Sequence, residues 1–230
     1  MEINIVEFVE GAQKAEGMAV IIDVFRAFSV ACYAFDAGAV RIIATAGPEE
    51  AFRVKEKYRN SILVGERAEK KIEGFDFGNS PTEMIKTDLR GKTVIHTTTA
   101  GTCGLLNASD ADTVITGSLV NSAAIIRYIK SVNPRVVTLV AMGYRATHSA
   151  DEDLLCARII EAGLKNRRFS FEKKINDLRK GSGLRFFLPE NIDYSPPTDF
   201  FLCTMQDKFD FILKGEKRPD GNIDLMKIDT

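Results

Sequence analysis

Side chains that can bind ions or carry protons gather in a few loops of this chain. Residues 73–81 read EGFDFGNSP, so that Glu73, Asp76, Asn79 and Ser80 stand among two glycines, two phenylalanines and a proline. A loop that only reverses the chain needs one or two special residues. The composition of this loop therefore indicates that it binds something.

Other acidic and basic groups directly follow apolar runs. Asp23 ends the run MAVIID and Arg26 comes three residues later, while Glu66 follows SILVG. Magnesium in proteins commonly takes one or two carboxylates together with waters and the phosphate of a substrate. Carboxylates on separate loops can converge on such an ion, and we expect Asp23, Glu66 and Asp76 to be its ligands.

Two further features suit an anion. Arg26 can clamp a phosphate, sulfonate or carboxylate with two parallel hydrogen bonds, and an ion pair with Asp23 is the alternative interpretation. The stretch HTTTAGT at 96–102 offers hydroxyl groups and free N–H groups at the start of a helix, although strand propensity also explains its threonines. Lys71 is a candidate substrate-binding cation.

The candidates form two sets. The predicted catalytic residues are Asp23, Arg26, Asp76 and Lys71. The predicted substrate-binding residues are Asn79, Ser80, Thr97, Thr98, Thr99, Gly101, Thr102, Ser118 and Asn121. Ser80 and other residues of these loops also suit helix capping, so the prediction depends on a shared location and not on any one residue.

That location follows from the order of elements. Short β-branched runs alternate with helix-like segments, which predicts a three-layer α/β/α sandwich with a mostly parallel (mixed) central sheet. Ligands of such sheets gather beyond the carboxyl ends of the strands. The expected strands lie at the N-terminus and at 18–23, 41–45, 61–65, 93–97, 113–117 and 135–143. The expected helices lie at 27–38, 48–58, from 81 onward, at 121–132 and at 153–163.

The tail of the chain is more charged. Its runs FDFILKG and IDLMKI flank a turn signal at 219–221 and are expected to form an antiparallel pair at a sheet edge. We interpret the tail as a continuation of the same fold. The prediction is one domain over residues 1–230.

Composition excludes several classes of protein. The net charge of −1 provides no general attraction to nucleic acid or to an anionic membrane, and no apolar run approaches eighteen residues. The four cysteines are far apart and form no CxxC pair, which is typical of a reducing cytoplasm. We expect a cytoplasmic protein that binds a small anionic phosphorylated metabolite and no nucleic acid or membrane. The sequence leaves open a homodimer.

Two other enzyme classes fit less well. Neither GxxxxGK[ST] nor GxGxxG is present, which disfavours a nucleotide-dependent enzyme. Cys103 suggests a cysteine phosphatase, but no arginine occupies the loop position that such a mechanism needs. His96 lies within a predicted strand and is better explained as a packing residue.

With these residues assembled, the chain resembles the 2-phosphosulfolactate phosphatase family, the ComB-like proteins. The resemblance runs in order through IIDVFRAFSVACYAFDAGA, VGERAEKKIEGFDFGNSP, HTTTAGT, TGSLVNSAA and DEDLLCA. It implies an α/β/α fold and magnesium-dependent hydrolysis of a phosphate monoester, in coenzyme M biosynthesis for the namesake. The matching residues beyond the candidates above are Arg67, Gly74, Gly78, Pro81, Gly117, Glu152 and Asp153.

The chain also departs from the family pattern. The family commonly reads close to DVLRATT, GERGG and TTTNGTRA, whereas this chain has Phe28, Ser29, Ala68 and Glu69, and replaces the last Asn and Arg by Ala100 and Cys103. The leading hypothesis is a magnesium-dependent phosphatase for 2-phosphosulfolactate or a related phospho-hydroxy acid. A catalytically inactive homologue that binds small anions is the alternative, because two potential anion contacts are lost.

Overall fold

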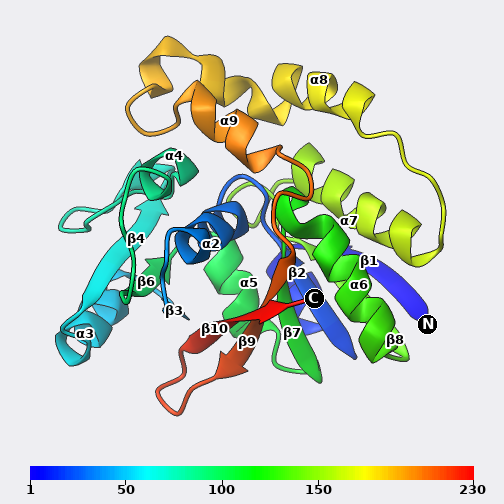
Figure 1. Ribbon diagram of the computed structural model, residues 1–230, viewed down its shortest axis with the longest axis horizontal. Helices are drawn as coiled ribbons and strands as arrows, with labels where there is room; N and C mark the ends of the chain where they lie inside the picture. The colour runs from blue at the N-terminus through cyan, green and yellow to red at the C-terminus, as the bar shows by residue number, and fades with distance from the viewer.

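The computed structural model describes the backbone of residues 1–230 and all side chains except those of residues 172 and 173. Its centre is a ten-stranded mixed sheet in the order β1-β8-β2-β7-β9-β10-β3-β6-β4-β5 (Figure 1). One parallel group consists of β1 (Glu2–Glu7), β8 (Val136–Ala141), β2 (Met18–Ile22) and β7 (Thr113–Gly117). The other consists of β3 (Arg41–Ala44), β6 (Thr93–Thr97) and β4 (Ser61–Arg67), with the short antiparallel β5 (Lys70–Lys71) at the edge.

An antiparallel hairpin joins the two parallel groups. It is formed by β9 (Phe211–Lys217) and β10 (Ile223–Asp229), which pair with β7 and β3 respectively. The prediction of a pair was right, but its expected place at a sheet edge was wrong. Ile212 and Leu213 point to opposite faces and are both fully buried, so the hairpin needs cover on both sides and lies inside the sheet.

Helices cover both faces, as the alternation predicted. One face carries α1 (Phe8–Gln13), α2 (Ala27–Asp36), α4 (Pro81–Met84) and α5 (Gly101–Asn107), and the other carries α3 (Pro48–Lys57), α6 (Ser122–Val132) and α7 (Asp151–Leu164). On β2, Ala19 and Ile21 enter the first core while Val20 and Ile22 enter the second. This alternation across a completely buried strand produces the three-layer sandwich.

A helical segment that the sequence reading did not foresee lies beyond the carboxyl ends of the strands (Figure 1). We call residues 172–203 the C-terminal cap. It contains α8 (Glu172–Lys180), η2 (Ser182–Phe187), η3 (Pro189–Asn191) and α9 (Pro197–Cys203), and a further 3-10 turn, η1 (Leu119–Asn121), follows β7. The cap contacts α4, α7 and η1, so it covers the strand ends from which the candidate residues emerge.

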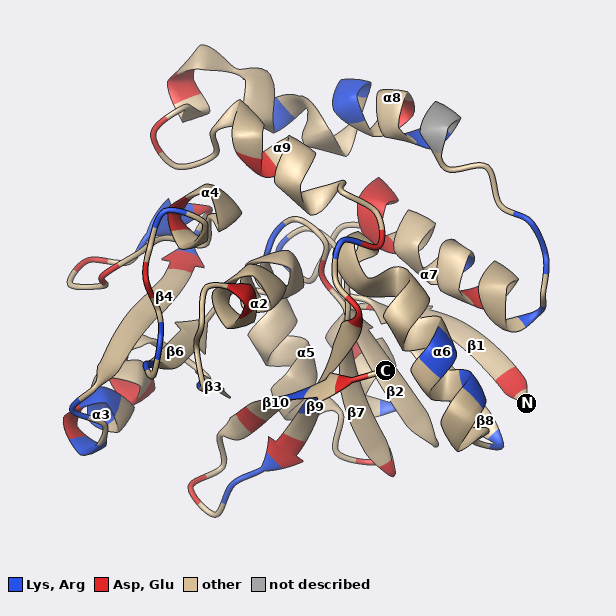
Figure 2. Cartoon of the chain, in the orientation of Figure 1, with Lys and Arg blue, Asp and Glu red and all other residues tan. Residues whose placement is uncertain are grey.

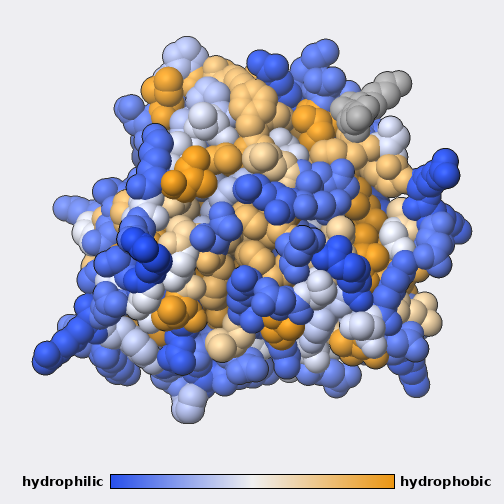
Figure 3. All heavy atoms as spheres, viewed as in Figure 1, coloured by the Kyte–Doolittle hydropathy of each residue, from blue (hydrophilic) through white to orange (hydrophobic). Residues whose placement is uncertain are grey.

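The surface carries charges of both signs. Figure 2 shows basic and acidic residues interleaved along the helices and loops, and Figure 3 shows hydrophilic residues among hydrophobic ones on the same face. This distribution agrees with the net charge of −1. Within the part of the chain that the structure describes, no helix has the length and apolar character needed to cross a membrane.

Candidate active site

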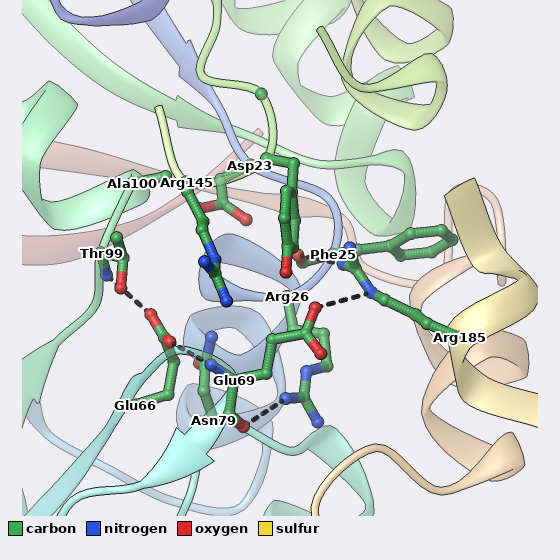
Figure 4. A pocket seen from close by; sticks show the side chains of 12 residues that line it. Asp23, Phe25, Arg26, Glu66, Glu69, Asn79, Thr99, Ala100, Arg145 and Arg185 are labelled. Atoms are coloured by element: carbon green, nitrogen blue, oxygen red, sulfur yellow. Dashed lines mark hydrogen bonds and ion pairs between the residues drawn. The ribbon is translucent and has the colours of Figure 1, made fainter. Parts of the chain in front are cut away.

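A small polar cavity lies between the strand ends and the C-terminal cap (Figure 4). Its walls come from the loops after β2, β4, β6 and β8, from the loop before α4 and from one residue of the cap. We call it the rim cavity. Its volume of about 50 Å³ holds only a few water molecules. It is lined by Asp23, Phe25, Arg26, Glu66, Glu69, Asn79, Thr99, Ala100, Gly143, Tyr144, Arg145 and Arg185.

Asp23 is a buried carboxylate with little protein compensation. It follows β2 directly and is 6% exposed, and its Oδ1 accepts a hydrogen bond from the N–H of Ala27 at 3.1 Å. A Cβ atom on Gly101 would lie 2.8 Å from Asp23 Oδ2, so glycine at the start of α5 makes room for this carboxylate. Burial, with smaller contributions from Glu66 and Glu152, raises the pKa of Asp23 to about 7.

Glu66 is held rigidly at the end of β4. Its Oε1 accepts the N–H of Thr99 at 2.7 Å and its Oε2 accepts the N–H of Glu69 at 2.8 Å. These two bonds connect the loop after β4 to the loop after β6. Glu66 therefore presents a fixed, 8% exposed carboxylate to the same cavity as Asp23.

Arg26 lines the rim cavity, but two of its hydrogen bonds go to residues of the cap. Its Nη1 donates to Asp199 Oδ2 at 2.7 Å and to the carbonyl oxygen of Tyr194 at 2.6 Å, and its Nη2 donates to the carbonyl oxygen of Glu69 at 3.3 Å. The alternative prediction of an Arg26–Asp23 pair was wrong, because Asp199 takes the place of Asp23. The charge of Arg26 is thus already balanced within the protein.

Arg145 was missed by the sequence reading. It follows β8 in a left-handed backbone conformation, and Figure 4 shows its side chain pointing into the rim cavity. Its guanidinium lies 5.2 Å from the ring centre of Tyr144 and has no ion pair or hydrogen bond with any described residue. The strand-end rule covers this position, since Arg145 comes two residues after the predicted strand at 135–143.

Arg185 was also missed, and no motif marks it because it lies in the charged tail. It reaches the rim cavity from the cap, where its Nε lies 3.3 Å from Glu69 Oε1 and its Nη2 donates to the carbonyl oxygen of Phe25 at 3.1 Å. Its guanidinium also lies 5.2 Å from the ring centre of Tyr144. Aromatic contacts of this kind hold a guanidinium in place while some of its N–H groups stay available.

The threonine loop contributes less than predicted. Of its candidates, Thr99 lines the rim cavity, and its buried Oγ1 has no hydrogen-bond partner among the described residues. Thr98 and Thr102 instead bond to each other at the start of α5, where each Oγ1 accepts the N–H of the other at 3.0–3.1 Å. Thr97 donates to the carbonyl oxygen of Thr45, and Gly101 packs against Asp23.

The loop at 73–81 divides between the cavity and the scaffold. Asn79 lines the rim cavity and bonds to His96 at 3.1 Å, which confirms His96 as a buried packing residue. Asp76 does not line this cavity. Its Oδ2 accepts the N–H of Leu63 and the Nζ of Lys55, both at 2.8 Å, and these bonds fix the loop beside the middle of β4. This placement corrects the expectation that Asp76 joins Asp23 and Glu66 as a ligand of one magnesium ion.

Four other candidates also lie outside the rim cavity. Lys71 is exposed on β5 and lines another surface pocket. The hydroxyl of Ser80 donates to Asp199 Oδ1 at 2.8 Å. Ser118 and Ser29 share a hydrogen bond of 2.7 Å, and Asn121 donates to the carbonyl oxygen of Phe211. In this conformation these groups position elements of the fold.

A second buried carboxylate supports the loops around the cavity. Asp153 Oδ1 accepts the N–H of Val24 at 2.8 Å and its Oδ2 accepts the N–H of Gly143 at 2.9 Å, so it joins the loops after β2 and β8. Burial raises the pKa of Asp153 well above its ordinary value, and the nearby acids Glu152 and Asp23 add to this rise. Glu152 is 2% exposed, and burial raises its pKa as well.

The donor set suits a hard cation, with two of the three predicted ligands in the rim cavity. Among the described residues, no group of three or more His, Cys, Asp and Glu side chains is arranged as a ready metal site. Asp23 and Glu66 nevertheless share the cavity, and burial, with a smaller contribution from the charge of Glu66, raises the pKa of Asp23. Two carboxylates are a sufficient protein contribution for magnesium. The carboxylate oxygens of Asp23 and Glu66 therefore fit a magnesium ion, and Asp76 is not among the groups that could hold it.

Taken together, the sheet order and the rim cavity define a three-layer α/β/α protein with a pocket of carboxylates and arginines at its strand ends. Residues 3–182 match the family model described as 2-phosphosulpholactate phosphatase. The chain belongs to this family.

Curated relatives agree with this assignment. The chain is 34% identical over 212 residues to a protein of Caldanaerobacter subterraneus subsp. tengcongensis named "Probable 2-phosphosulfolactate phosphatase", with 85% of this chain and 86% of that protein covered. A protein of the same name from Bacillus subtilis is 31% identical over 212 residues, covering 89% and 88%. One from Carboxydothermus hydrogenoformans is 40% identical over 140 residues, covering 60% and 58%.

Proposed function

We propose that this protein is a magnesium-dependent phosphatase that hydrolyses a small acidic phosphate monoester, with 2-phosphosulfolactate as the leading candidate substrate. Membership of the family and the names of the relatives support the reaction and the substrate. One structural observation carries the proposal: the rim cavity combines two buried carboxylates, Asp23 and Glu66, with Arg145, a cation that no described residue neutralises.

The acidic and the basic side chains of the rim cavity would bind different parts of the ligand. A phosphate dianion beside Asp23 and Glu66 alone would be repelled, whereas a divalent cation between them removes the repulsion. Arg145 would bind the outer oxygens of the phosphoryl group, because its guanidinium offers a planar fork of donors. The unpartnered hydroxyl of Thr99 and the amide of Asn79 add uncharged hydrogen-bonding groups.

The reaction itself needs little covalent work from the protein. The bond between phosphorus and the ester oxygen breaks, a bond to the oxygen of water forms, and the departing alkoxide takes up the proton that the attacking water loses. Magnesium held by Asp23 and Glu66 would supply charge neutralisation at the phosphoryl oxygens and a more acidic bound water. Asp153 keeps the loops after β2 and β8 in place.

A catalytically inactive anion-binding homologue is the second candidate. Ala100 lines the rim cavity at the position where the family commonly has an Asn, so this chain has one polar group fewer on the cavity wall. Cys103 lies in α5, one helical turn further along, and is not part of the wall. Only the Ala100 departure thus favours loss of activity.

Phosphate release from 2-phosphosulfolactate, with magnesium or with EDTA, tests the proposal. We expect release that requires magnesium and that Arg145→Gln reduces by about tenfold to a hundredfold, the range for losing a charge-assisted hydrogen bond. Arg179→Gln is the matched control, because Arg179 is exposed and lines neither the rim cavity nor its neighbours. Phosphate release that does not depend on magnesium would contradict the proposed metal requirement. Binding of 2-phosphosulfolactate without release of phosphate would favour the inactive homologue.

We further propose that residues 1–230 act as one domain. The hairpin of β9 and β10 lies between the two parallel groups of the sheet, and the cap supplies Arg185 to the cavity. Both parts of the tail are therefore integral to the arrangement on which the proposed activity depends.

A further inference from the structure

A second, larger cavity adjoins the rim cavity beneath the C-terminal cap. Its volume is about 500 Å³, compared with about 50 Å³ for the rim cavity. The two cavities share three wall residues, which are Glu69, Tyr144 and Arg185. A substrate whose phosphoryl group occupies the rim cavity has no room there for the rest of the molecule. The adjoining cavity, which shares these three wall residues, offers room for the remaining part.

Arg185 stands at the junction of the two cavities. Figure 4 shows its side chain entering from the cap and ending between Phe25 and Glu69. Its side chain is 18% exposed, with Nε facing Glu69 and Nη2 bonded to the carbonyl oxygen of Phe25. Its Nη1 has no hydrogen-bond partner among the described residues. A guanidinium fixed by its other nitrogens can use these donors without a further loss of side-chain freedom.

We propose that Arg185 is a specificity-determining residue that binds an acidic group, sulfonate or carboxylate, on the alcohol part of the substrate. The inference rests on the proposed function and adds a role that differs from that of Arg145. Arg145 lines only the rim cavity and serves the phosphate of any ester. Arg185 serves only esters that carry a second anionic group. Arg185 lies in η2, so the cap supplies this selectivity.

The charges around Arg185 set the strength of this contact. Glu69 lies 3.3 Å from its Nε, and Glu152 lines the adjoining cavity with an Oε2 that has no partner among the described residues. These acids repel an anion that has no arginine to bind it. Removal of Arg185 therefore leaves the adjoining cavity acidic, and selectivity for an acidic substrate is lost as well as affinity.

The test compares two kinds of ligand in matched variants. Calorimetry measures the binding of sulfolactate, the dephosphorylated product, and of inorganic phosphate to the wild type and to Arg185→Gln, Arg185→Lys, Arg145→Gln and Arg179→Gln. We expect Arg185→Gln to weaken sulfolactate binding by about tenfold to a hundredfold while phosphate binding changes less than about threefold. Arg145→Gln should weaken phosphate binding, Arg185→Lys should restore part of the sulfolactate affinity, and the control Arg179→Gln should change neither.

Turnover gives an independent readout. For Arg185→Gln, kcat/KM should fall for 2-phosphosulfolactate and stay within about threefold for ethyl phosphate, whose alcohol part is uncharged. Equal losses for both esters, or sulfolactate binding that is absent or unaffected by Arg185→Gln, would overturn the inference. If the wild type binds sulfolactate through Arg185 but releases no phosphate from any ester, the proposed function fails while the role of Arg185 stands. Thermal unfolding of each variant identifies losses that come from misfolding.

Discussion

Two buried aspartates, one in the wall of the rim cavity and one in the cap, differ in how far other residues compensate their charge. Asp199, in the cap, is fully buried and receives bonds from Arg26, from Ser80 and from both the N–H and the hydroxyl of Thr82. The carboxylate of Asp23, at the end of β2, accepts one hydrogen bond from the described residues, from the N–H of Ala27, and has acidic neighbours. The first carboxylate connects the cap to the sheet. The second lines the rim cavity with little compensation from the protein, as the proposed metal ligand requires.

This contrast separates structural from functional charge. A buried ion pair with further hydrogen bonds needs nothing from outside, and breaking it is strongly destabilising. A buried carboxylate without such partners has a raised pKa and is typical of a functional site. Sequence position does not distinguish the two, since both aspartates lie beside the start of a helix.

Replacement of Asp23 should have the largest effect on activity. Asp23→Asn keeps an acceptor for Ala27 but removes a proposed metal ligand, and we expect phosphate release to fall by about a thousandfold or more, as when a group acting on transition-state charge is lost. Measurement of kcat at saturating magnesium checks this. Retained turnover would exclude Asp23 from the site.

The same variant should be more stable than the wild type in the absence of metal. The pKa of Asp23 is raised to about 7 in the folded protein, above the value of 3.8 for a free side chain. The folded state therefore favours the protonated form, and stability falls as the pH rises from about 4 to 7. Above pH 7 the free energy of unfolding of Asp23→Asn should exceed that of the wild type, by at most about 4 kcal/mol. Urea unfolding at pH 5 and pH 8 in EDTA measures the change, and a gain that shrinks at higher pH would contradict it.

Replacement of Asp199 should act mainly on stability. Asp199→Asn leaves Arg26 buried without its counter-charge, and we expect the free energy of unfolding to fall by about 3–5 kcal/mol. Asp210→Asn is the matched control, since Asp210 pairs with Arg127 at the surface and is 87% exposed. Its loss should be below about 1 kcal/mol. Similar losses of stability in Asp199→Asn and Asp210→Asn would contradict the structural role of Asp199.

The smallest effect is expected at Asp76. Its carboxylate bonds to Leu63 and Lys55 on the scaffold and does not reach the rim cavity. Asp76→Asn should therefore keep turnover within about threefold and lower the free energy of unfolding by about 1 kcal/mol, the typical worth of a hydrogen bond. Steady-state kinetics of Asp76→Asn, measured in parallel with Asp23→Asn, tests this expectation. A loss as large as that of Asp23→Asn would return Asp76 to the catalytic set.

Sequence patterns located most of the fold and several residues that line the rim cavity. The alternation of apolar runs with helical segments led to the α/β/α sandwich, because burial on both faces leaves a distinct pattern along a strand. The strand-end rule led to Asp23, Glu66, Asn79 and Thr99 in one cavity. The rule did not distinguish these four residues from Thr98 and Ser80. The hydroxyl of Thr98 accepts the N–H of Thr102 at the start of α5, and that of Ser80 donates to Asp199.

The amino-acid order by itself determined which segments form strands and helices and which family the chain resembles, since periodicity and motifs are local properties. Only the tertiary structure decided which charges remain uncompensated. Asp199 neutralises Arg26 across 173 positions, Lys55 engages Asp76, and Arg185 arrives from the cap. Electrostatic compensation depends on distance in space and on burial, and neither quantity is contained in the spacing of residues along the chain.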